Sequence, residues 1–403
     1  MEKKMEVTIM WEQLGQSAIT SLGFFWKAGW AFVLGYLISS MIQAFIPQGK
    51  LAGYIGKYNV KSIGLATLFG AISSSCSFAA LAAGKSLFKK GAHFIATLAF
   101  LFASTNLVIE LGILIYIFLG WQFVVAEIIG GILLIIVVSV LARITMPKKW
   151  VQAARERTED EQQEEFDWKK KIRTKEGWYQ VGHEFVMNWQ MVWKDITIGF
   201  TIAGIMATFV PESFWEGLFM AGTDGGFWVV LENALIAPLA AALTFIGSMG
   251  NIPISTILAS SGVTFAGIMA FIYSDLIVPP IVMVNKKYYG WKLALYIAGI
   301  FYVSIVATAL LIHGGFAALG ILPESGRQIM NESPFQIDYT FWFNIVFALI
   351  ALFALWLFRQ FKKSGAHAGM MSMEGDSRFK TIVTWICIAF LAIGTLLHFV
   401  LML

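Results

Sequence analysis

Long apolar runs alternate with short charged segments along most of this chain. The runs cover residues 18–46, 62–84, 92–119, 121–146, 189–211, 227–259, 263–284, 291–313, 341–358 and 380–402. An α-helix needs about 20 apolar residues to cross the hydrocarbon core of a bilayer. The pattern therefore predicts an all-α polytopic membrane protein with about 9–10 transmembrane segments.

The charged segments divide the chain into four predicted parts. We expect a first membrane half at 1–146, a charged cytoplasmic linker at 147–188, a second membrane half at 189–315, and two extra C-terminal transmembrane helices at 316–403. The short basic turn with Lys85, Lys89 and Lys90 is typical of a cytoplasmic loop.

The second membrane half resembles the first at an offset of 171 residues. Residues 91–100 (GAHFIATLAF) align without gaps on 262–271 (GVTFAGIMAF), and the small, hydroxyl-rich stretch 70–84 has a faint copy at 246–256. Many transporters are built from such internal repeats. The alignment indicates an internal duplication, and it leaves parallel and inverted arrangements of the halves open.

A count of crossings predicts a broken or re-entrant segment in the second half. The linker and the basic loop at 359–380 both suit the cytoplasm, yet five apolar runs lie between them. The region 246–284 contains several glycines and prolines that disfavour uninterrupted helix. Non-helical backbone at membrane depth is tolerated where it lines a cavity or packs in protein. We therefore expect broken or re-entrant helices at the interface between the repeats.

Small polar residues inside the apolar runs are the candidates for a substrate path. Hydroxyl and amide groups at such positions line a polar path, although small residues also permit close helix packing in lipid. Both interpretations stay open at this stage. The candidates for substrate binding are Ser74, Ser75, Cys76, Ser77, Ser104, Thr105, Asn106, Ser248, Asn251, Pro253 and Ser255.

Two carboxyl groups lie deep inside apolar runs, at Asp275 and Glu110. A carboxylate is expensive there and is usually paired, protonated or exposed to water. Either residue could bind a cation or carry a proton for coupling, and the alternative is a structural cap in a broken helix. Other charged residues lie nearer to run ends, where snorkelling or interfacial pairing is expected. They are Lys27, Lys194, Asp195, Glu127 and Glu232.

Composition and motifs argue against other function classes. The net charge of +4 is spread over loops and implies no nucleic-acid partner. The chain has no zincin motif, nucleophile elbow or Walker loop, so we expect no enzyme activity, catalytic residue, metal site or cofactor. The expected partners are a small solute or ion and the lipid bilayer, with a homo-oligomer left open.

Several blocks of sequence resemble a known family. These blocks are Ser75–Ser77, Leu87–Ala92, Ala99–Asn106 and the second copy around Gly262 and Phe271. They are similar to the predicted-permease family that includes the YraQ-like proteins and the trivalent organoarsenical efflux permeases. The resemblance implies a multi-pass permease of the cytoplasmic (inner) membrane with two related halves, and in one branch efflux and arsenic resistance.

The chain departs from this family at its cysteines. Members commonly show a Cys-x-Cys element followed by proline, whereas this stretch holds the single Cys76. Trivalent arsenic favours several soft ligands, so one thiol is a poor site for it. The resemblance therefore supports transport more strongly than it supports an arsenical substrate.

The sequence thus predicts a secondary transporter that moves a small solute or ion by alternating access with proton coupling. Two other hypotheses remain open. The first is a membrane scaffold that recruits a partner through the 147–188 loop, and the second is a passive channel.

Overall fold

The chain is helical throughout the part that the computed structural model describes. This part comprises residues 2–45, 55–56, 58–73, 77–156, 173–220, 226–244, 246–323, 335–364 and 378–402. It contains no β-strand, and eight of its helical segments are long and apolar enough to cross a membrane; one of these, Phe265–Tyr289, runs through three successive shorter helices. A bent pair, α5 and α6, raises the number to nine when it is counted as one span. The prediction of an all-α polytopic membrane protein is confirmed.

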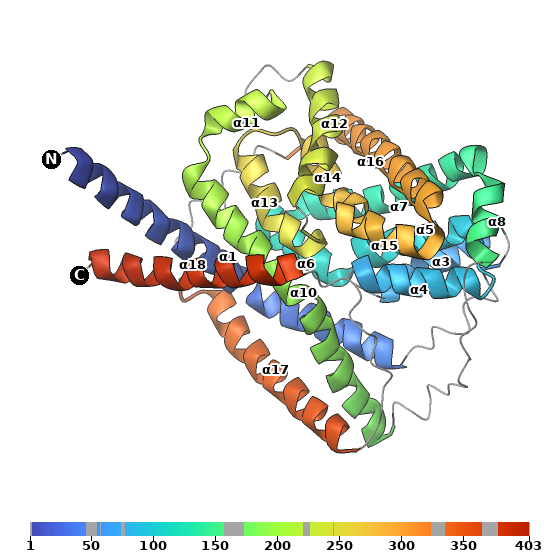
Figure 1. Ribbon diagram of the computed structural model, residues 1–403, viewed down its shortest axis with the longest axis horizontal. Helices are drawn as coiled ribbons and strands as arrows, with labels where there is room; N and C mark the ends of the chain where they lie inside the picture. Colours follow the sequence, from blue (N-terminus) through green and yellow to red (C-terminus); the bar gives the residue numbers. More distant parts are fainter. Residues whose placement is uncertain are drawn as a thin grey trace.

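The helices follow one another in the order shown by colour in Figure 1. The first group is α1 (Glu2–Phe45), α3 (Val60–Ser73), α4 (Ser77–Lys89), α5 (Phe94–Asn106), α6 (Ile109–Leu119), α7 (Trp121–Thr145) and α8 (Lys148–Glu156). The second is α10 (Lys175–Phe209), α11 (Glu212–Phe219), α12 (Phe227–Thr244), α13 (Ser248–Ser260), α14 (Phe265–Ile272), the 3-10 helix η2 (Tyr273–Ile277), α15 (Pro279–Tyr289) and α16 (Trp291–Leu319). The last two helices are α17 (Tyr339–Lys363) and α18 (Arg378–Met402).

Three boundaries differ from those expected. Helix α1 begins at residue 2 rather than near 18, and α10 begins at Lys175, within the predicted linker. Thr174 caps α10, because its side chain accepts a hydrogen bond from the Gly177 amide at 3.2 Å. The single run expected at 62–84 contains two helices, α3 and α4. Hydropathy marks the part of a helix that lies in lipid, whereas caps set its end in water.

Two stretches of the fold have the same order of elements. Helices α3, α4, α5, α6 and α7 correspond to α12, α13, α14 with η2, α15 and α16. The turn after α4 places Gly91 at φ +101°, and the turn after α13 places Gly262 at φ +82°. Gly120 and Gly290, which precede α7 and α16, have φ values of +95° and +86°. Glycine is the residue that adopts such angles without strain, so both stretches use it at corresponding turns.

The two stretches pack across one another in a reciprocal manner. Helix α4 contacts α15, and α13 contacts α6, while α7 and α16 pack side by side. Lys85 of α4 places its ammonium 4.5 Å from the centre of the Tyr288 ring of α15. The Phe102 ring of α5 packs against the Phe301 ring of α16 in a tilted arrangement, with 4.2 Å between ring centres. The short helices of each stretch are therefore buried by the other stretch.

Helices α17 and α18 pack against α1 and α10 at one side of the molecule, where both termini also lie (Figure 1). Glycines permit these close approaches. A Cβ at Gly394 of α18 would meet the Ala18 side chain at 2.6 Å, and one at Gly182 of α10 would meet Leu357 of α17 at 2.6 Å. In lipid such small-residue contacts drive helix association. The remaining surface of α17 and α18 is largely exposed and apolar, which suits contact with lipid.

Candidate functional site

Asp275 lies at a break in the helices of the second stretch. Helix α14 ends at Ile272, η2 follows, and Pro279 begins α15. Two consecutive prolines lack the amide hydrogens that would continue the α-helix, and they suit the first turn of the next one. The backbone therefore tightens into a 3-10 turn at this point. It holds Asp275 fully buried, with 0% of the residue exposed.

Two residues of the first stretch meet this carboxyl group. The Ser77 hydroxyl donates a hydrogen bond to the Asp275 Oδ2 atom at 2.8 Å, across 198 residues of sequence. The Asn106 side chain also interacts with the Asp275 carboxyl. Ser77 is the first residue of α4, and Asn106 is the last residue of α5. The structure thus brings together three of the residues that the sequence singled out, at the contact between the two stretches.

The neighbouring candidates of the first stretch have different surroundings. Ser74, Ser75 and Cys76 lie outside the described residues, directly before Ser77. The Ser104 hydroxyl donates to the Leu101 carbonyl at 3.0 Å, within its own helix.

The last turn of α5 carries the other two candidates. The Thr105 hydroxyl also bonds to the backbone of α5, and it lies 3.0 Å from the Asn106 Nδ2 atom. The Asn106 Oδ1 atom is buried and accepts no hydrogen bond from the described residues. The hydroxyls of Ser104 and Thr105 therefore have hydrogen-bond partners within α5, whereas the Oδ1 atom of Asn106 has no donor in the described part of the chain.

Helix α13 carries the candidates of the second stretch. Pro253 lies inside this helix and cannot donate to the Met249 carbonyl, one turn earlier. The Ser255 hydroxyl donates to the Asn251 carbonyl at 2.8 Å. The Asn251 side chain is fully buried, and neither its Nδ2 nor its Oδ1 atom has a partner among the described residues. Ser248 begins the helix. Helix α13 packs against η2, but no hydrogen bond found here joins these residues to Asp275.

Glu110, the second carboxyl that the sequence singled out, packs against another part of the fold. It lies in the first turn of α6 and is 2% exposed. A Cβ at Gly35 of α1 would overlap the Glu110 side chain, so the two helices cross closely here. The side chains found to interact with the Asp275 carboxyl are those of Ser77, Asn106 and Glu127, and the backbone of Leu276 lies beside it. The coupling role of Glu110 stays a prediction.

Glu127 is a carboxyl group that the sequence analysis placed wrongly. We expected it near a helix end, with snorkelling or interfacial pairing. It lies instead two turns inside α7 and is 2% exposed. Neither of its carboxyl oxygens has a hydrogen-bond partner among the described residues. Glu127 interacts electrostatically with both Asp275 and Tyr273. The glycine pair that follows at Gly130 and Gly131 was the signal for a closely packed helix face.

Asp195 and Lys194 contact residues of the C-terminal helix α18. The Lys380 ammonium lies 2.7 and 2.8 Å from the two carboxyl oxygens of Asp195, and the Lys194 ammonium donates to the Thr381 hydroxyl at 2.9 Å. These contacts join α10 to α18. The Asp195 carboxyl also lies close to Gly247, at the start of α13.

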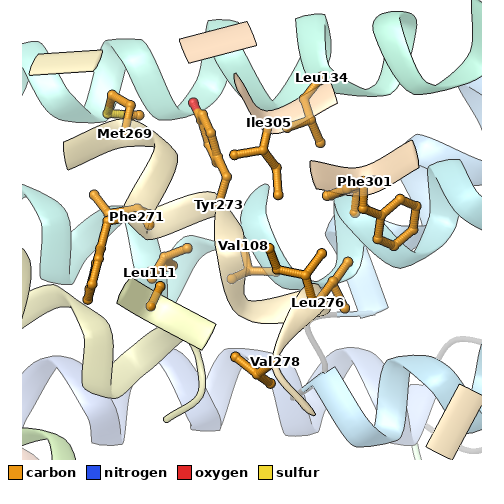
Figure 2. Close-up of a cluster of buried hydrophobic side chains, with 14 of the residues drawn as sticks. Val108, Leu111, Leu134, Met269, Phe271, Tyr273, Leu276, Val278, Phe301 and Ile305 are labelled. Carbon is orange, nitrogen blue, oxygen red and sulfur yellow. The ribbon is translucent and has the colours of Figure 1, made fainter. Parts of the chain in front are cut away.

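Tyr273 connects the break to α7 within an apolar cluster. Its hydroxyl donates to the Ala126 carbonyl at 2.9 Å, and the ring is fully buried. Figure 2 shows the hydroxyl pointing toward α7, with Ile305 beside the ring. A Cβ at Gly130 would overlap the Tyr273 hydroxyl, so only glycine permits this approach.

The polar side chains described around Asp275 share a simple chemistry. Their polar atoms are carboxyl, amide and hydroxyl groups, with no thiol or imidazole among the described residues near Asp275. No group of three or more His, Cys, Asp and Glu residues that could hold a metal ion occurs in the described ranges.

Comparison with known proteins yields one family and two curated relatives. The ArsP_1 family model, described as a predicted permease, matches residues 14–314. "Putative permease Rv2963" of Mycobacterium tuberculosis is 35% identical over 321 residues, which cover 76% of this chain and 78% of the relative. "UPF0718 protein YraQ" of Escherichia coli K12 is 24% identical over 309 residues, covering 75% and 82%. No solved structure gives a significant match.

Proposed function

Since the chain belongs to the ArsP_1 family of predicted permeases and is a multi-pass membrane protein, we propose that it is a secondary transporter coupled to protons through Asp275. It moves a small solute or ion by alternating access. One observation carries the proposal: a fully buried carboxyl in a broken helix accepts a hydrogen bond from Ser77 of the other stretch. Intramembrane carboxyl groups of this kind are characteristic of ion and proton pathways.

The proposed transport unit consists of the two membrane halves at 1–146 and 189–315. The match to the family model ends at residue 314, near the end of the second half. Broken helices at the contact between repeats are the usual place for a substrate site, because their free backbone groups are available to a ligand. In this chain the breaks follow α5 and η2, and both contribute to the surroundings of Asp275.

Protonation of Asp275 would change the contact between the halves. A carboxylate accepts hydrogen bonds only, whereas a protonated carboxyl also donates one. The charged form accepts from Ser77, and the neutral form gains a donor for an acceptor such as the open Asn106 Oδ1 atom. A proton therefore alters which groups of α4, α5 and η2 bind one another, and it biases the relative position of the halves.

Transport in proteoliposomes tests this proposal. Vesicles containing the purified protein and a pH-sensitive dye are exposed to a panel of organic cations, organic anions, amino acids and trivalent arsenicals. The arsenicals and the efflux direction are included because of the sequence resemblance. We expect saturable flux of one solute class with accompanying proton movement. Asp275→Asn should abolish the proton movement, whereas Ser274→Ala, a fully buried neighbour whose hydroxyl bonds within its own helix, should retain it.

The same assay separates the competing hypotheses. A passive channel predicts flux that does not saturate and does not move protons. A scaffold predicts no flux with any solute in the panel. Unchanged proton coupling in Asp275→Asn would refute the site assignment even if transport occurs.

A further inference from the structure

Two buried carboxyl groups from different parts of the chain interact electrostatically near η2. Asp275 comes from the second stretch, and Glu127 comes from α7 of the first. Asp275 is 0% exposed and Glu127 is 2% exposed. Tyr273 links them, since its hydroxyl bonds to the backbone of α7 beside Glu127 and its own position is two residues before Asp275. Glu127 interacts electrostatically with both residues.

Several hydrogen-bond acceptors around this pair of carboxyl groups lack a donor in the part of the chain that the structure describes. Both oxygens of Glu127 and the Oδ1 atom of Asn106 are buried and lack a hydrogen-bond donor among the described residues. The Asp275 Oδ1 atom also lacks a well-formed hydrogen bond with these residues, and the backbone amides of Leu276 and Asp275 are the groups that lie near this carboxyl. All four atoms are acceptors when the carboxyls are ionised. Buried acceptors without a donor are rare in proteins and costly. What the cluster lacks is therefore a donor or a cation.

No basic side chain of the surrounding helices supplies that missing charge. The helices packed against η2 and α7 are α5, α6, α12, α13, α14, α15 and α16. Their titratable and charged groups make the contacts that follow, or are exposed. The acids and two of the tyrosines have partners in their own surroundings: Glu110 packs on Gly35, Glu232 bonds to Asn233, Tyr296 bonds to Thr145 and Tyr302 bonds to Leu235. The other groups lie against aromatic or basic side chains: Lys286 over Trp291, Lys85 over Tyr288, Arg143 over Tyr58, His313 near Phe265 and Tyr289 near Phe88. Lys287, Lys292 and Tyr116 are exposed.

We propose that Glu127 and Asp275 form one proton-binding unit, in which the two carboxyl groups share a single proton. Two like charges held together in a desolvated site cannot both stay ionised, and their protons leave in coupled steps. The shared proton provides the missing donor, which satisfies one of the open acceptors. This inference deepens the proposed function and rests on it.

The pair is also placed to sense the relative position of the two halves. Glu127 belongs to α7, whereas Asp275 is bonded to Ser77 at the start of α4. A movement that separates η2 from α7 would separate the two carboxyl groups and weaken their mutual repulsion. Separation would therefore release the proton and approach would take one up, which is the link that alternating access with proton coupling requires.

Infrared difference spectroscopy on the full-length protein in lipid nanodiscs tests the inference directly. The carboxylic-acid C=O band of Asp275 is identified as the band that Asp275→Asn removes, and its midpoint is followed against pH. We expect Glu127→Gln to lower this midpoint by about one pH unit or more, since it removes the second negative charge. Glu232→Gln, the matched control on α12, whose carboxyl bonds to Asn233, should leave the midpoint unchanged. Glu127→Asp retains the charge and should restore most of the coupling, which guards against a variant that misfolds.

Each outcome bears on the inference. The inference would be overturned if the Asp275 midpoint were the same in Glu127→Gln and in the wild type. It would also be overturned if the band disappeared when sodium replaced choline at constant ionic strength, because the site would then bind an alkali cation instead of a proton. The spectroscopic result does not require a known solute. Coupled titration without flux in proteoliposomes would therefore refute the proposed transport and leave the shared proton standing, whereas coupled flux with independent titrations would do the reverse.

Discussion

Replacement of Lys380 by methionine removes the cation that the two oxygens of Asp195 bind. Both side chains are mostly buried, with 18% and 12% of their surfaces exposed, and the two N–O distances are 2.7 and 2.8 Å. Loss of one member of such a pair typically costs about 3–5 kcal/mol, because the other charge stays in a desolvated site. We expect a loss near the lower end of this range, since water still reaches part of both side chains.

The double variant Asp195→Asn, Lys380→Met separates the pair from general packing effects. In the double variant no charge is left unpaired. Its loss of unfolding free energy should therefore be smaller, by at least about 2 kcal/mol, than the sum of the losses in the two single variants. Denaturant titration of the purified protein in detergent measures the free energies of unfolding. Arg378→Met, on an exposed position of the same helix, is the matched control and should change stability by less than about 0.5 kcal/mol.

Additive single losses would refute this reasoning, as would losses below about 0.5 kcal/mol. The expected result would also have a structural meaning. Helix α18 lies outside the residues that the family model matches, yet it supplies the cation beside the start of α13. The C-terminal helices would then be part of the folded unit, and truncation before α18 should reproduce the loss.

Two further predictions concern packing and pH. Gly199→Ala should destabilise the protein by about 1–3 kcal/mol, because the added Cβ would meet the backbone of Gly250 at 2.5 Å, whereas Gly299→Ala meets nothing and should be neutral or stabilising in the same titration. Burial and then the Arg155 guanidinium lower the pKa of His93, whose Nδ1 atom caps α5. The neutral imidazole should contribute its full stabilisation above about pH 6.5, the pKa of histidine in the unfolded chain, and this stabilisation should be lost as the pH falls through the lower pKa of His93 in the folded protein. In unfolding curves recorded across pH, His93→Asn should therefore show a weaker dependence of stability on pH.

Hydropathy and glycine positions predicted much of this fold, because both act locally. An apolar run in lipid must satisfy its backbone within one helix, so its centre is readable from sequence. The region 246–284 was expected to break, and it contains α13, α14, η2 and α15. Gly91 and Gly262 align in the repeat, and both have the positive φ that a tight turn requires.

The site was harder to predict because its contacts are not local. Asp275 and Ser77 are 198 residues apart, and Asp195 and Lys380 are 185 apart. The position of Asp275 in the middle of an apolar run correctly predicted that it is buried. The same argument failed for Glu127, because its burial depends on which helices pack against α7. The sequence also could not distinguish Asn106 from Ser104 and Thr105, because all three lie in the same turn. In the structure the Ser104 and Thr105 hydroxyls bond within their own helix, whereas the Asn106 Oδ1 atom has no donor among the described residues.

The duplicated arrangement of helices carries a carboxyl pair that is not duplicated. At the offset of 171 residues Asp275 corresponds to Ser104, and Asn106 corresponds to Ile277. The shorter offset of 170 between Gly120 and Gly290 relates Glu127 to Ile297. The acids of both halves therefore meet at one of two equivalent crossings, and apolar or hydroxyl side chains occupy the other. Each buried carboxyl is costly at membrane depth, so a second pair would double the cost. In the proposed transporter one pair is enough for one proton in each transport cycle, so we expect the variants of Asp275 and Glu127 to affect the same coupling step.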